Sequence, residues 1–400
     1  MLWIVNAQVL DAAGRRFARA DIGIDGEVIR EVVARASPEP DDDVIDLAGS
    51  WVLPGLIDCH VHLTQPTDAG DPSAASTRSD AEVALYTAKS AERTLLNGIT
   101  TARDVGGWNY VEMAVRDAIR DGLAIGPRLF LAGRLLSIST STVDLYPGMY
   151  EAADGADAVR AAARRQLARG ADLIKVMATG AMLSSETEDA RAIQFTLEEL
   201  RAAVEIAHDN YKHVAAHAHA CRGIENCVEA GVDSIEHCTF ADDAVLARIA
   251  AAGIFVVPTI CAGELFVRDE QVMASTPRYL RERMVDFNGI HLDTMRRAHA
   301  AGVEIAMGTD AGTPGNHHGM NTHEVVFMVN EIGMTPQQAI ASSTIKPARL
   351  LHRQYQLGSI EPGKFADLIA MRTDPFDDIT AVTAVRWVMK GGRVYRSDDL

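Results

Sequence analysis

The hydrophobic pattern is of one kind at the two ends of the chain and of another kind in the middle. At both ends, short segments alternate apolar and polar residues between polar turns, which is typical of half-buried strands. Examples are "LWIVNAQVL" and "DIGIDGEVIREV" near the start, and "GKFADLIAM" and "AVRWVMKGGRVYR" near the end. We therefore expect residues 1–53 and 356–400 to build one small β-sandwich domain.

In the middle of the chain, strand-like apolar runs alternate with stretches of helical periodicity. One of these stretches places Thr196 and Glu199 at the spacing of a helix-capping box, which marks the start of a helix. Eight strand-then-helix units are the pattern of a TIM-like (β/α)8 barrel, an α/β fold, which we expect over residues 54–355. The eight runs are "GLIDCHVHL", "ITTARDV", "RLFLAG", "DLIKVMAT", "HVAAHAHA", "SIEHC", "IFVVPTI" and "VEIAMGTD".

Composition narrows the classes of function. The chain of 400 residues has 38 Lys and Arg against 55 Asp and Glu, a formal charge of −17, which argues against nucleic acid or an anionic membrane as a partner. The five cysteines form no CxxC pair, so we expect reduced thiols in a cytoplasmic protein. No basic leader precedes an apolar segment, and no apolar run reaches the ~18 residues of a membrane span.

The run "LPGLIDCHVHL" carries two histidines where a strand enters the core. Alternate side chains of a strand share a face, so Asp58, His60 and His62 point one way while Cys59 and Val61 point the other. The histidines then meet at the carboxyl end of a barrel strand, where barrel active sites lie, and imidazole is a good zinc ligand. For this pair alone, two hydrogen-bonded core histidines are an equally good interpretation.

Other strand ends carry the same residue types. His217 and His219 end one run, His237 ends the next, and Asp310 closes the last. A single buried histidine is usually structural, and an Asp before Gly is usually a turn residue. Packing alone does not explain His or Asp at several strand ends on the catalytic face of one barrel, so a site is the better interpretation.

Lys175 stands inside the apolar run "DLIKVMAT". A buried, unpaired ammonium is strongly disfavoured, so this side chain either reaches water at the strand end or has an anionic partner. Beside a histidine cluster, a desolvated and neutral amine could instead take up carbon dioxide as a carbamate, whose two oxygens could bridge two cations.

Taken together, these segments resemble the amidohydrolase superfamily of metal-dependent hydrolases. The resemblance rests on "DCHVHL", "LIKVMAT", "HVAAHAHA", "SIEHC" and "GTDAG" in this order, with the tail "GSIEPGKFADLIAM", and it covers nearly the whole chain. The chain is most similar to the branch of Xaa-Pro dipeptidases, Xaa-Arg/Lys carboxypeptidases and ochratoxin-type amidases. Oligomers are common in the superfamily, so we expect a homo-oligomer.

This resemblance implies a binuclear metal centre. A hydroxide between the ions would attack the amide carbonyl, with Asp310 as general base and then acid. We expect zinc because the ligands are rich in histidine. The implied ligands are His60, His62 and Asp310 for one ion, His217 and His237 for the other, and Lys175 as a bridging N6-carboxylysine.

The same branch suggests a dipeptide or an N-acyl amino acid as the small-molecule substrate. Some dipeptidases of the branch have tyrosine where this chain has His219, which we assign to the substrate or its developing oxyanion. Arg103, His317 and His318 lie at or beyond strand ends and are further candidates for contact with the substrate, although His317 and His318 could equally face water. We expect an apolar leaving residue, because no carboxylate is clearly placed to receive a basic one.

Two other functions compete. A mononuclear deaminase or imidazolonepropionase-like cyclic amidohydrolase of this superfamily usually lacks the bridging lysine and often has a glutamate soon after the fifth-strand histidine, whereas "HAHACRG" has none. A metal-free scaffold protein would have lost ligands, yet every expected position is filled. Lys175 therefore favours the binuclear amidohydrolase.

Overall fold

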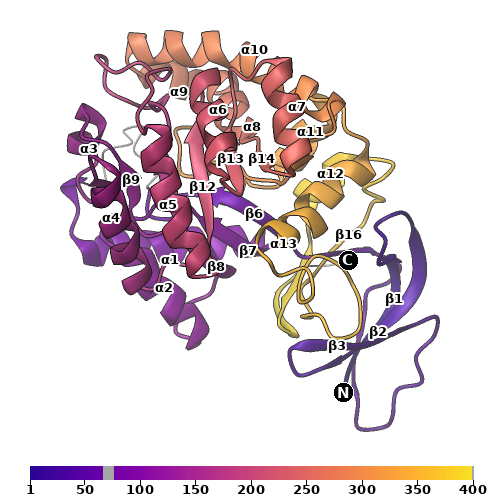
Figure 1. The fold of residues 1–400 in the computed structure, drawn as a ribbon. Coiled ribbons are helices and arrows are strands. Elements are labelled where there is room, and N and C mark those ends of the chain that lie inside the picture. The colour runs from indigo at the N-terminus through magenta and orange to yellow at the C-terminus, as the bar shows by residue number, and fades with distance from the viewer. Residues whose placement is uncertain (66–75, 399–400) are drawn as a thin grey trace.

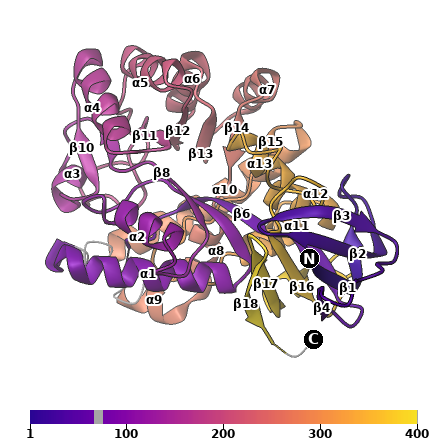
Figure 2. The same cartoon turned by 90° about the horizontal axis from the view of Figure 1, so that it is seen from below.

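The computed structural model describes residues 1–65 and 76–398. Strands from the two chain ends lie together on one side of the molecule, and a body of parallel strands and helices forms the rest (Figures 1 and 2). None of the described helices is long and apolar enough to cross a membrane.

The parallel strands form a seven-stranded sheet in the order β10-β9-β11-β12-β13-β14-β15 and a three-stranded sheet in the order β6-β7-β8. Each of the eight predicted runs contains one of these strands, so the α/β alternation is confirmed. The strands are β6 (Leu56–Val61), β7 (Ile99–Asp104), β8 (Arg128–Leu131), β9 (Leu135–Ser137), β10 (Tyr150–Ala152), β11 (Leu173–Met177), β12 (His213–Ala218), β13 (Ser234–His237), β14 (Phe255–Val257) and β15 (Glu304–Ile305).

Backbone hydrogen bonds link the two parallel sheets. On one side, the amide of Cys59 in β6 donates to the Met307 carbonyl at 2.8 Å, and the amide of Asp310 donates to the His60 carbonyl at 2.7 Å. On the other side, the amide of Asp172 donates to the Leu131 carbonyl at the end of β8 at 2.7 Å. The segment that follows β15 is therefore held directly against the strand that carries the first histidine pair.

Helices pack around the parallel strands (Figure 2). The predicted capping box is confirmed: the Thr196 hydroxyl accepts from the Glu199 amide, and the Glu199 carboxylate accepts from the Thr196 amide. The helices are α1 (Asp80–Leu96), α2 (Val111–Arg120), α3 (Ser141–Leu145), α4 (Ala156–Ala168), α5 (Leu197–Asp209), α6 (Cys221–Ala230), α7 (Asp243–Ala252), α8 (Ile260–Arg268), α9 (Glu270–Ser275), α10 (Arg278–Ala300), α11 (His323–Asn330), α12 (Pro336–Ser343), α13 (Ile345–Leu350) and the 3-10 helix η3 (Ile379–Ala384).

Strands from both chain ends share one eight-stranded sheet. The C-terminal strand β16 pairs antiparallel with β5, with Ile369 opposite Leu53, and β5 in turn pairs with β1. A separate apolar core that includes Ile4, Ile22 and Trp387 joins residues from both ends. The strands are β1 (Leu2–Leu10), β2 (Phe17–Asp25), β3 (Val28–Val33), β4 (Asp43–Asp46), β5 (Trp51–Pro54), β16 (Leu368–Met371), β17 (Trp387–Lys390) and β18 (Arg393–Ser397).

Candidate metal centre

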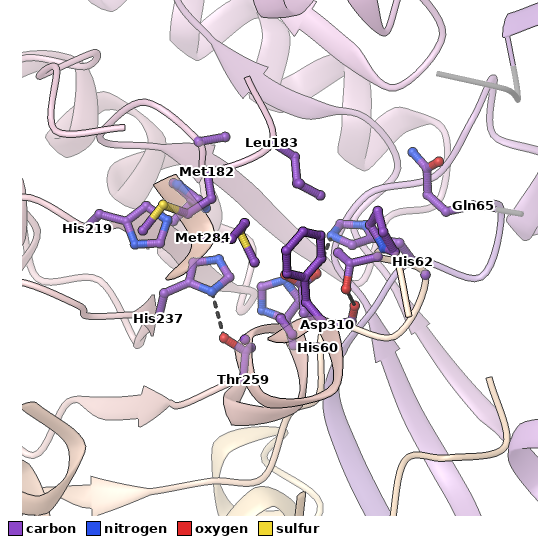
Figure 3. Close-up of a pocket in the computed structure, with 18 of the residues that line it drawn as sticks. His60, His62, Gln65, Met182, Leu183, His219, His237, Thr259, Met284 and Asp310 are labelled. Atoms are coloured by element: carbon purple, nitrogen blue, oxygen red, sulfur yellow. Dashed lines mark hydrogen bonds and ion pairs between the residues drawn. The ribbon is translucent and has the colours of Figure 1, made fainter. Parts of the chain in front are cut away.

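His60 and His62 project from the end of β6 toward Asp310. Their Nε2 atoms lie 3.5 and 3.3 Å from the same Asp310 oxygen, Oδ1. The strand alternation predicted for "DCHVHL" explains why both imidazoles point the same way. Figure 3 shows the two rings beside Asp310 at one end of the pocket. These three side chains form one half of the site.

His217, His237 and Lys175 come from the neighbouring strands β12, β13 and β11. The rings of His217 and His237 have centroids 4.6 Å apart, and the His237 ring lies 5.0 Å from that of His60, which joins the two halves. Lys175 is 1% exposed, and its Nζ has no hydrogen-bond partner among the described residues. Burial lowers the pKa of Lys175 to about 8, which increases the fraction of neutral amine.

Hydrogen bonds behind the rings set which nitrogen faces the centre. Nδ1 of His60 donates to the Glu236 carboxylate at 2.7 Å, and Nδ1 of His62 donates to the Gly106 carbonyl at 3.0 Å, so Nε2 of each ring is the nitrogen that faces Asp310. His217 is reversed: its Nε2 donates to the Gly180 carbonyl at 3.0 Å and leaves Nδ1 free. Such outer contacts orient histidine ligands in metal sites.

His237 is held in the same manner. Its Nδ1 lies 2.7 Å from the hydroxyl of Thr259, which leaves Nε2 free; the contact is drawn as a dashed line in Figure 3. Burial lowers the pKa of His60 to about 4 and that of His217 to about 3, and it also lowers the pKa of His237. Neutral imidazoles are the form that binds metal ions.

A buried ion pair between Arg103 and Glu236 lies on the Nδ1 side of His60. Arg103 donates to Glu236 at 2.8 Å, and both side chains are fully buried. Burial acts to raise the pKa of Glu236. The charges of Arg103 and Lys175 nevertheless hold this pKa below its ordinary value. Glu236 is therefore a carboxylate that can accept the Nδ1 proton of His60.

Three residues of the site have an unusual backbone conformation. His237, Thr259 and Asp310 have φ angles of 70°, 53° and 59°, in the left-handed region that residues other than glycine rarely adopt. Gly308 permits the close approach that places Asp310, because a Cβ at Gly308 would lie 2.8 Å from the Cβ of His60. Conformations of this kind cluster at functional sites, where the surrounding structure holds them.

The donor set fits divalent cations. Imidazole nitrogens face one carboxylate and a buried amine that has no hydrogen-bond partner among the described residues, and a nitrogen-rich set with carboxylate oxygen suits zinc and similar ions. Two overlapping groups, His60 with His237 and Asp310, and His217 with His219 and His237, each have ligand atoms within 4.8 Å of one another.

Of the residues expected to contact the substrate, only His219 lines the described pocket. His219 lines the pocket and is 3% exposed, with no partner for Nε2 among the described residues. Arg103 does not line the pocket, because its guanidinium is held beneath the site by Cys59 and Glu236, so the expected substrate contact is replaced by a supporting role. His317 and His318 are also absent from the lining of the described pocket, and Nε2 of His318 donates to the His62 carbonyl at 3.2 Å.

Sequence reasoning missed the residues that hold the ligands. Asp58 accepts from the Thr309 amide at 3.1 Å and from the Thr309 hydroxyl at 2.7 Å, which fixes the segment before Asp310. Asp58 and Glu236 both stand inside apolar strands, and a buried acid in such a strand is the signal that could have identified them.

The rest of the pocket wall is mainly apolar and aromatic. Among the described lining residues, Asp310 is the only acid and Lys175 the only Lys or Arg. The apolar wall includes Leu135, Tyr146, Met149, Tyr150, Met182, Leu183, Phe266, Met284 and Phe287.

The fold and the site together define a hydrolase of the metal-dependent kind. The sequence matches the Amidohydrolase family over residues 51–395, and the chain belongs to this family. It is therefore an enzyme, a hydrolase.

Relatives agree with this assignment. Ochratoxinase from Aspergillus niger is 32% identical over 379 residues, covering 87% of this chain and 76% of the relative. An imidazolonepropionase from Geobacillus kaustophilus is 26% identical over 434 residues, covering 99% and 90%. The structure of a Xaa-Pro dipeptidase with methionine bound in its active site has a TM-score of 0.91 at 36% identity, covering 99% of this chain and all of the other.

Proposed function

We propose that this protein is a binuclear metal-dependent amidohydrolase that cleaves the amide bond of a dipeptide or N-acyl amino acid. The observation that carries the proposal is the buried Nζ of Lys175, which lies among histidines and one aspartate and has no hydrogen-bond partner in the described part of the chain. A lone ammonium would be unstable there, whereas a neutral amine can add carbon dioxide, release one proton and become a carbamate with two ligand oxygens. The names of similar proteins, a dipeptidase and an ochratoxinase, support an amide substrate.

In this proposal each ligand has a defined role. When bound, two divalent cations, for which we propose zinc, would lower the pKa of a water molecule and polarise the substrate carbonyl. The Asp310 side chain is 14% exposed and reaches the pocket, so it can take a proton and later deliver it to the leaving amine. The proposed ligands are His60, His62 and Asp310 for the first ion, His217 and His237 for the second, and Lys175 as N6-carboxylysine between them.

The apolar walls of the pocket support a proposal about the leaving residue of the substrate. Because Asp310 is the only acid in the described lining, a basic leaving residue would have no partner apart from the metal ligands, and we propose an apolar one. Ligand sites typically combine such walls with a few polar groups that fix orientation.

The proposal extends to the architecture. The eight predicted strands, linked by the hydrogen bonds from β6 to the segment after β15 and from Asp172 to β8, are consistent with one (β/α)8 barrel over residues 54–355. Residues 1–53 and 356–400 would form the accompanying β-sandwich domain. We further propose a homo-oligomer in the cytoplasm, which light scattering and cell fractionation test.

The similarity to an imidazolonepropionase favours a second candidate, a mononuclear cyclic amidohydrolase. Lys175 argues against it, because a mononuclear centre has no use for a bridging carbamate. Metal analysis separates the two: the binuclear proposal requires close to two divalent ions per chain.

The reaction is tested with purified, metal-loaded enzyme. The substrates are N-acetyl amino acids and dipeptides with apolar or basic leaving residues, and the controls are a cyclic amide, a lactone and a phosphotriester. We expect fastest release of apolar amino acids. Faster turnover of any control than of every linear amide would contradict the proposed reaction and leave the metal centre untouched.

A further inference from the structure

A chain of hydrogen bonds runs from the pocket wall to the backbone behind it. Nδ1 of His219 lies 2.8 Å from the Thr239 hydroxyl, which lies 3.3 Å from Nδ1 of His291. Nε2 of His291 lies 2.7 Å from the Pro258 carbonyl. All three side chains are buried, so water does not compete for these contacts.

His291 fixes the direction of this chain. A carbonyl only accepts, so Nε2 of His291 carries a proton and donates to Pro258. Burial lowers the pKa of His291 to about 4, so the ring is neutral and its Nδ1 bears a lone pair. The Thr239 hydroxyl then donates to His291 and accepts from Nδ1 of His219. The opposite orientation would leave two lone pairs facing each other across 3.3 Å.

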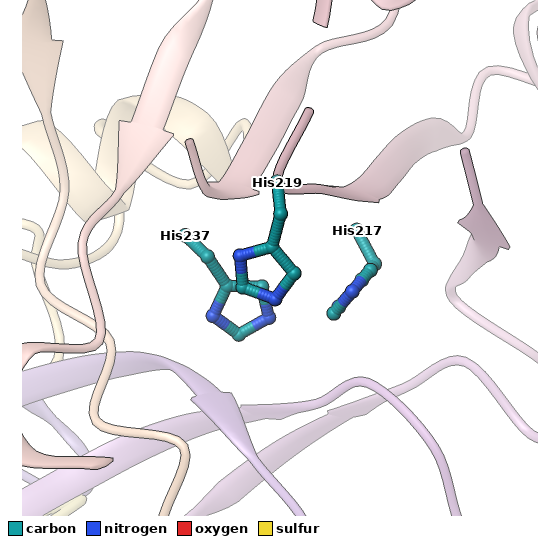
Figure 4. Close-up of side chains that lie close together, drawn as sticks. All are labelled: His217, His219 and His237. Carbon is teal, nitrogen blue, oxygen red and sulfur yellow. The ribbon is translucent and has the colours of Figure 1, made fainter. Parts of the chain in front are cut away.

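This direction leaves the other nitrogen of His219 unprotonated. Nε2 of His219 is buried and has no partner in the described part of the chain. One ring nitrogen of each of His217, His219 and His237 lies within 4.8 Å of those of the other two. Figure 4 shows the ring of His219 stacked against that of His237, with the ring of His217 beside them. Three buried imidazoles with ligand atoms this close together can share one cation.

We propose that His217, His219 and His237 together form a three-nitrogen cation site, with Thr239 and His291 as positioning residues for His219. The inference rests on the proposed metal centre and adds a ligand to its second ion. It also replaces the oxyanion role expected for His219, because a lone pair cannot donate a hydrogen bond to an oxyanion. Three imidazoles that leave a fourth position for another ligand are a recurrent arrangement for zinc, and in the proposed centre the Lys175 carbamate would take that position.

Three variants test the inference. His219→Phe removes both nitrogens and keeps a ring, and Thr239→Val removes the hydroxyl that orients His219. Thr294→Val is the matched control, because the Thr294 hydroxyl is also buried and donates to the backbone carbonyl of Thr239 without entering the chain. The dissociation constant of each ion is measured by titration with Zn²⁺ or Co²⁺ against a chelator, and Co²⁺ absorption reports the ligand set.

We expect Thr239→Val to weaken the second ion about tenfold, His219→Phe to weaken it more, and Thr294→Val to leave both ions unchanged. The first ion keeps its affinity in all three variants. In addition, long-range proton–nitrogen spectra of metal-free protein labelled with 15N-histidine report the tautomer directly. The resonances lost in His219→Phe should be those of a ring protonated at Nδ1.

The outcomes are distinct. If wild type binds two ions and His219→Phe binds both with the same affinities as wild type, this inference is wrong and the proposed function is unaffected. Protonation at Nε2 of His219 in the metal-free protein would also overturn this inference and leave the proposed function unaffected. Wild type that binds a single ion would overturn both. If His219→Phe does not fold, the comparison of Thr239→Val with Thr294→Val decides, because equal ion affinities in these two variants would refute the positioning role.

Discussion

At the scale of single residues, Lys175 is the most informative side chain. Its Nζ is buried without a partner among the described residues, and Lys175 lies on β11, the strand between β9 and β12. The Lys175→Ala variant should lose at least one of two bound ions and reduce turnover on the order of 100-fold, because the bridging oxygens disappear. Metal analysis and amide hydrolysis measure both effects.

Rescue of Lys175→Ala by a small carboxylate distinguishes loss of the bridging oxygens from damage to the fold. Acetate or propionate fits the space left in Lys175→Ala and supplies two oxygens, so either should restore part of the metal content and activity. Lys89→Ala is the control, because Lys89 lies exposed on α1 in a pair with Glu92. Full metal content and activity in Lys175→Ala would contradict the bridge.

Arg103 supports a prediction about stability. Replacing Arg103 with Met leaves the buried Glu236 without its cation, which should lower the free energy of unfolding by about 3–5 kcal/mol. The matched change Arg120→Met removes exposed ion pairs with Asp117 and Asp121 and should cost much less. Urea denaturation measures both. Equal losses in the two variants would mean that the buried pair contributes no more than a surface pair.

The residue scale also marks the limit of sequence reasoning. Strand alternation was sufficient to predict that His60 and His62 face the same way. The partners of these ligands could not be predicted, because Arg103 and Glu236 are 133 residues apart and meet only through the order of the strands. The sequence suggested a substrate contact for Arg103 because its run ends on the catalytic side, and the pairing with Glu236 became visible only in three dimensions.

At the scale of elements, strands within long runs of the expected pattern were predictable, and two short strands outside those runs were not. Strands β14 and β15 have three and two residues, but they lie in the predicted runs "IFVVPTI" and "VEIAMGTD". Strands β9 and β10 have three residues each and lie outside the predicted runs, where so short a segment shows no clear period of two. The same limit applies to α9, a helix of six residues with no buried face.

The start of α5 gives a prediction at this scale. Thr196→Ala removes the hydroxyl that accepts from the Glu199 amide, and it should lower the free energy of unfolding by about 1 kcal/mol. Glu198→Ala is the control, because Glu198 lies in the same first turn outside the box and should change stability by less than about 0.5 kcal/mol. Thermal unfolding of the metal-loaded proteins compares them. A Thr196→Ala midpoint equal to wild type would contradict a stabilising cap.

At the scale of the whole molecule, the site depends on strands that are far apart in sequence. Its proposed ligands come from β6, β11, β12, β13 and the segment after β15. The pairing of β16 with β5 joins the end of the chain to the strand that leads into β6. The pattern at both ends predicted a shared unit, but the order of its strands depends on pairings that no local period encodes.

Stability of the whole molecule should also depend on pH through Glu112. This side chain is buried near the start of α2, and neither carboxyl oxygen has a hydrogen-bond partner in the described structure. Burial, with a smaller contribution from the neighbouring Asp104, raises the pKa of Glu112 to about 8. The folded protein therefore keeps a proton that the unfolded chain releases near pH 4.5.

The sign of the pH effect follows from this difference. Stability from protonated Glu112 is fully present below about pH 4.5 and is lost as the pH rises to about 8, because only the unfolded chain gains charge freely. Glu112→Gln removes the titration and keeps the shape. We expect the variant to match wild type within about 1 kcal/mol at pH 5 and to be more stable by roughly 4 kcal/mol at pH 8. Urea denaturation of both proteins at each pH, with ions at equal saturation, measures the difference. A constant difference across this range would mean that Glu112 is ionised in the folded protein.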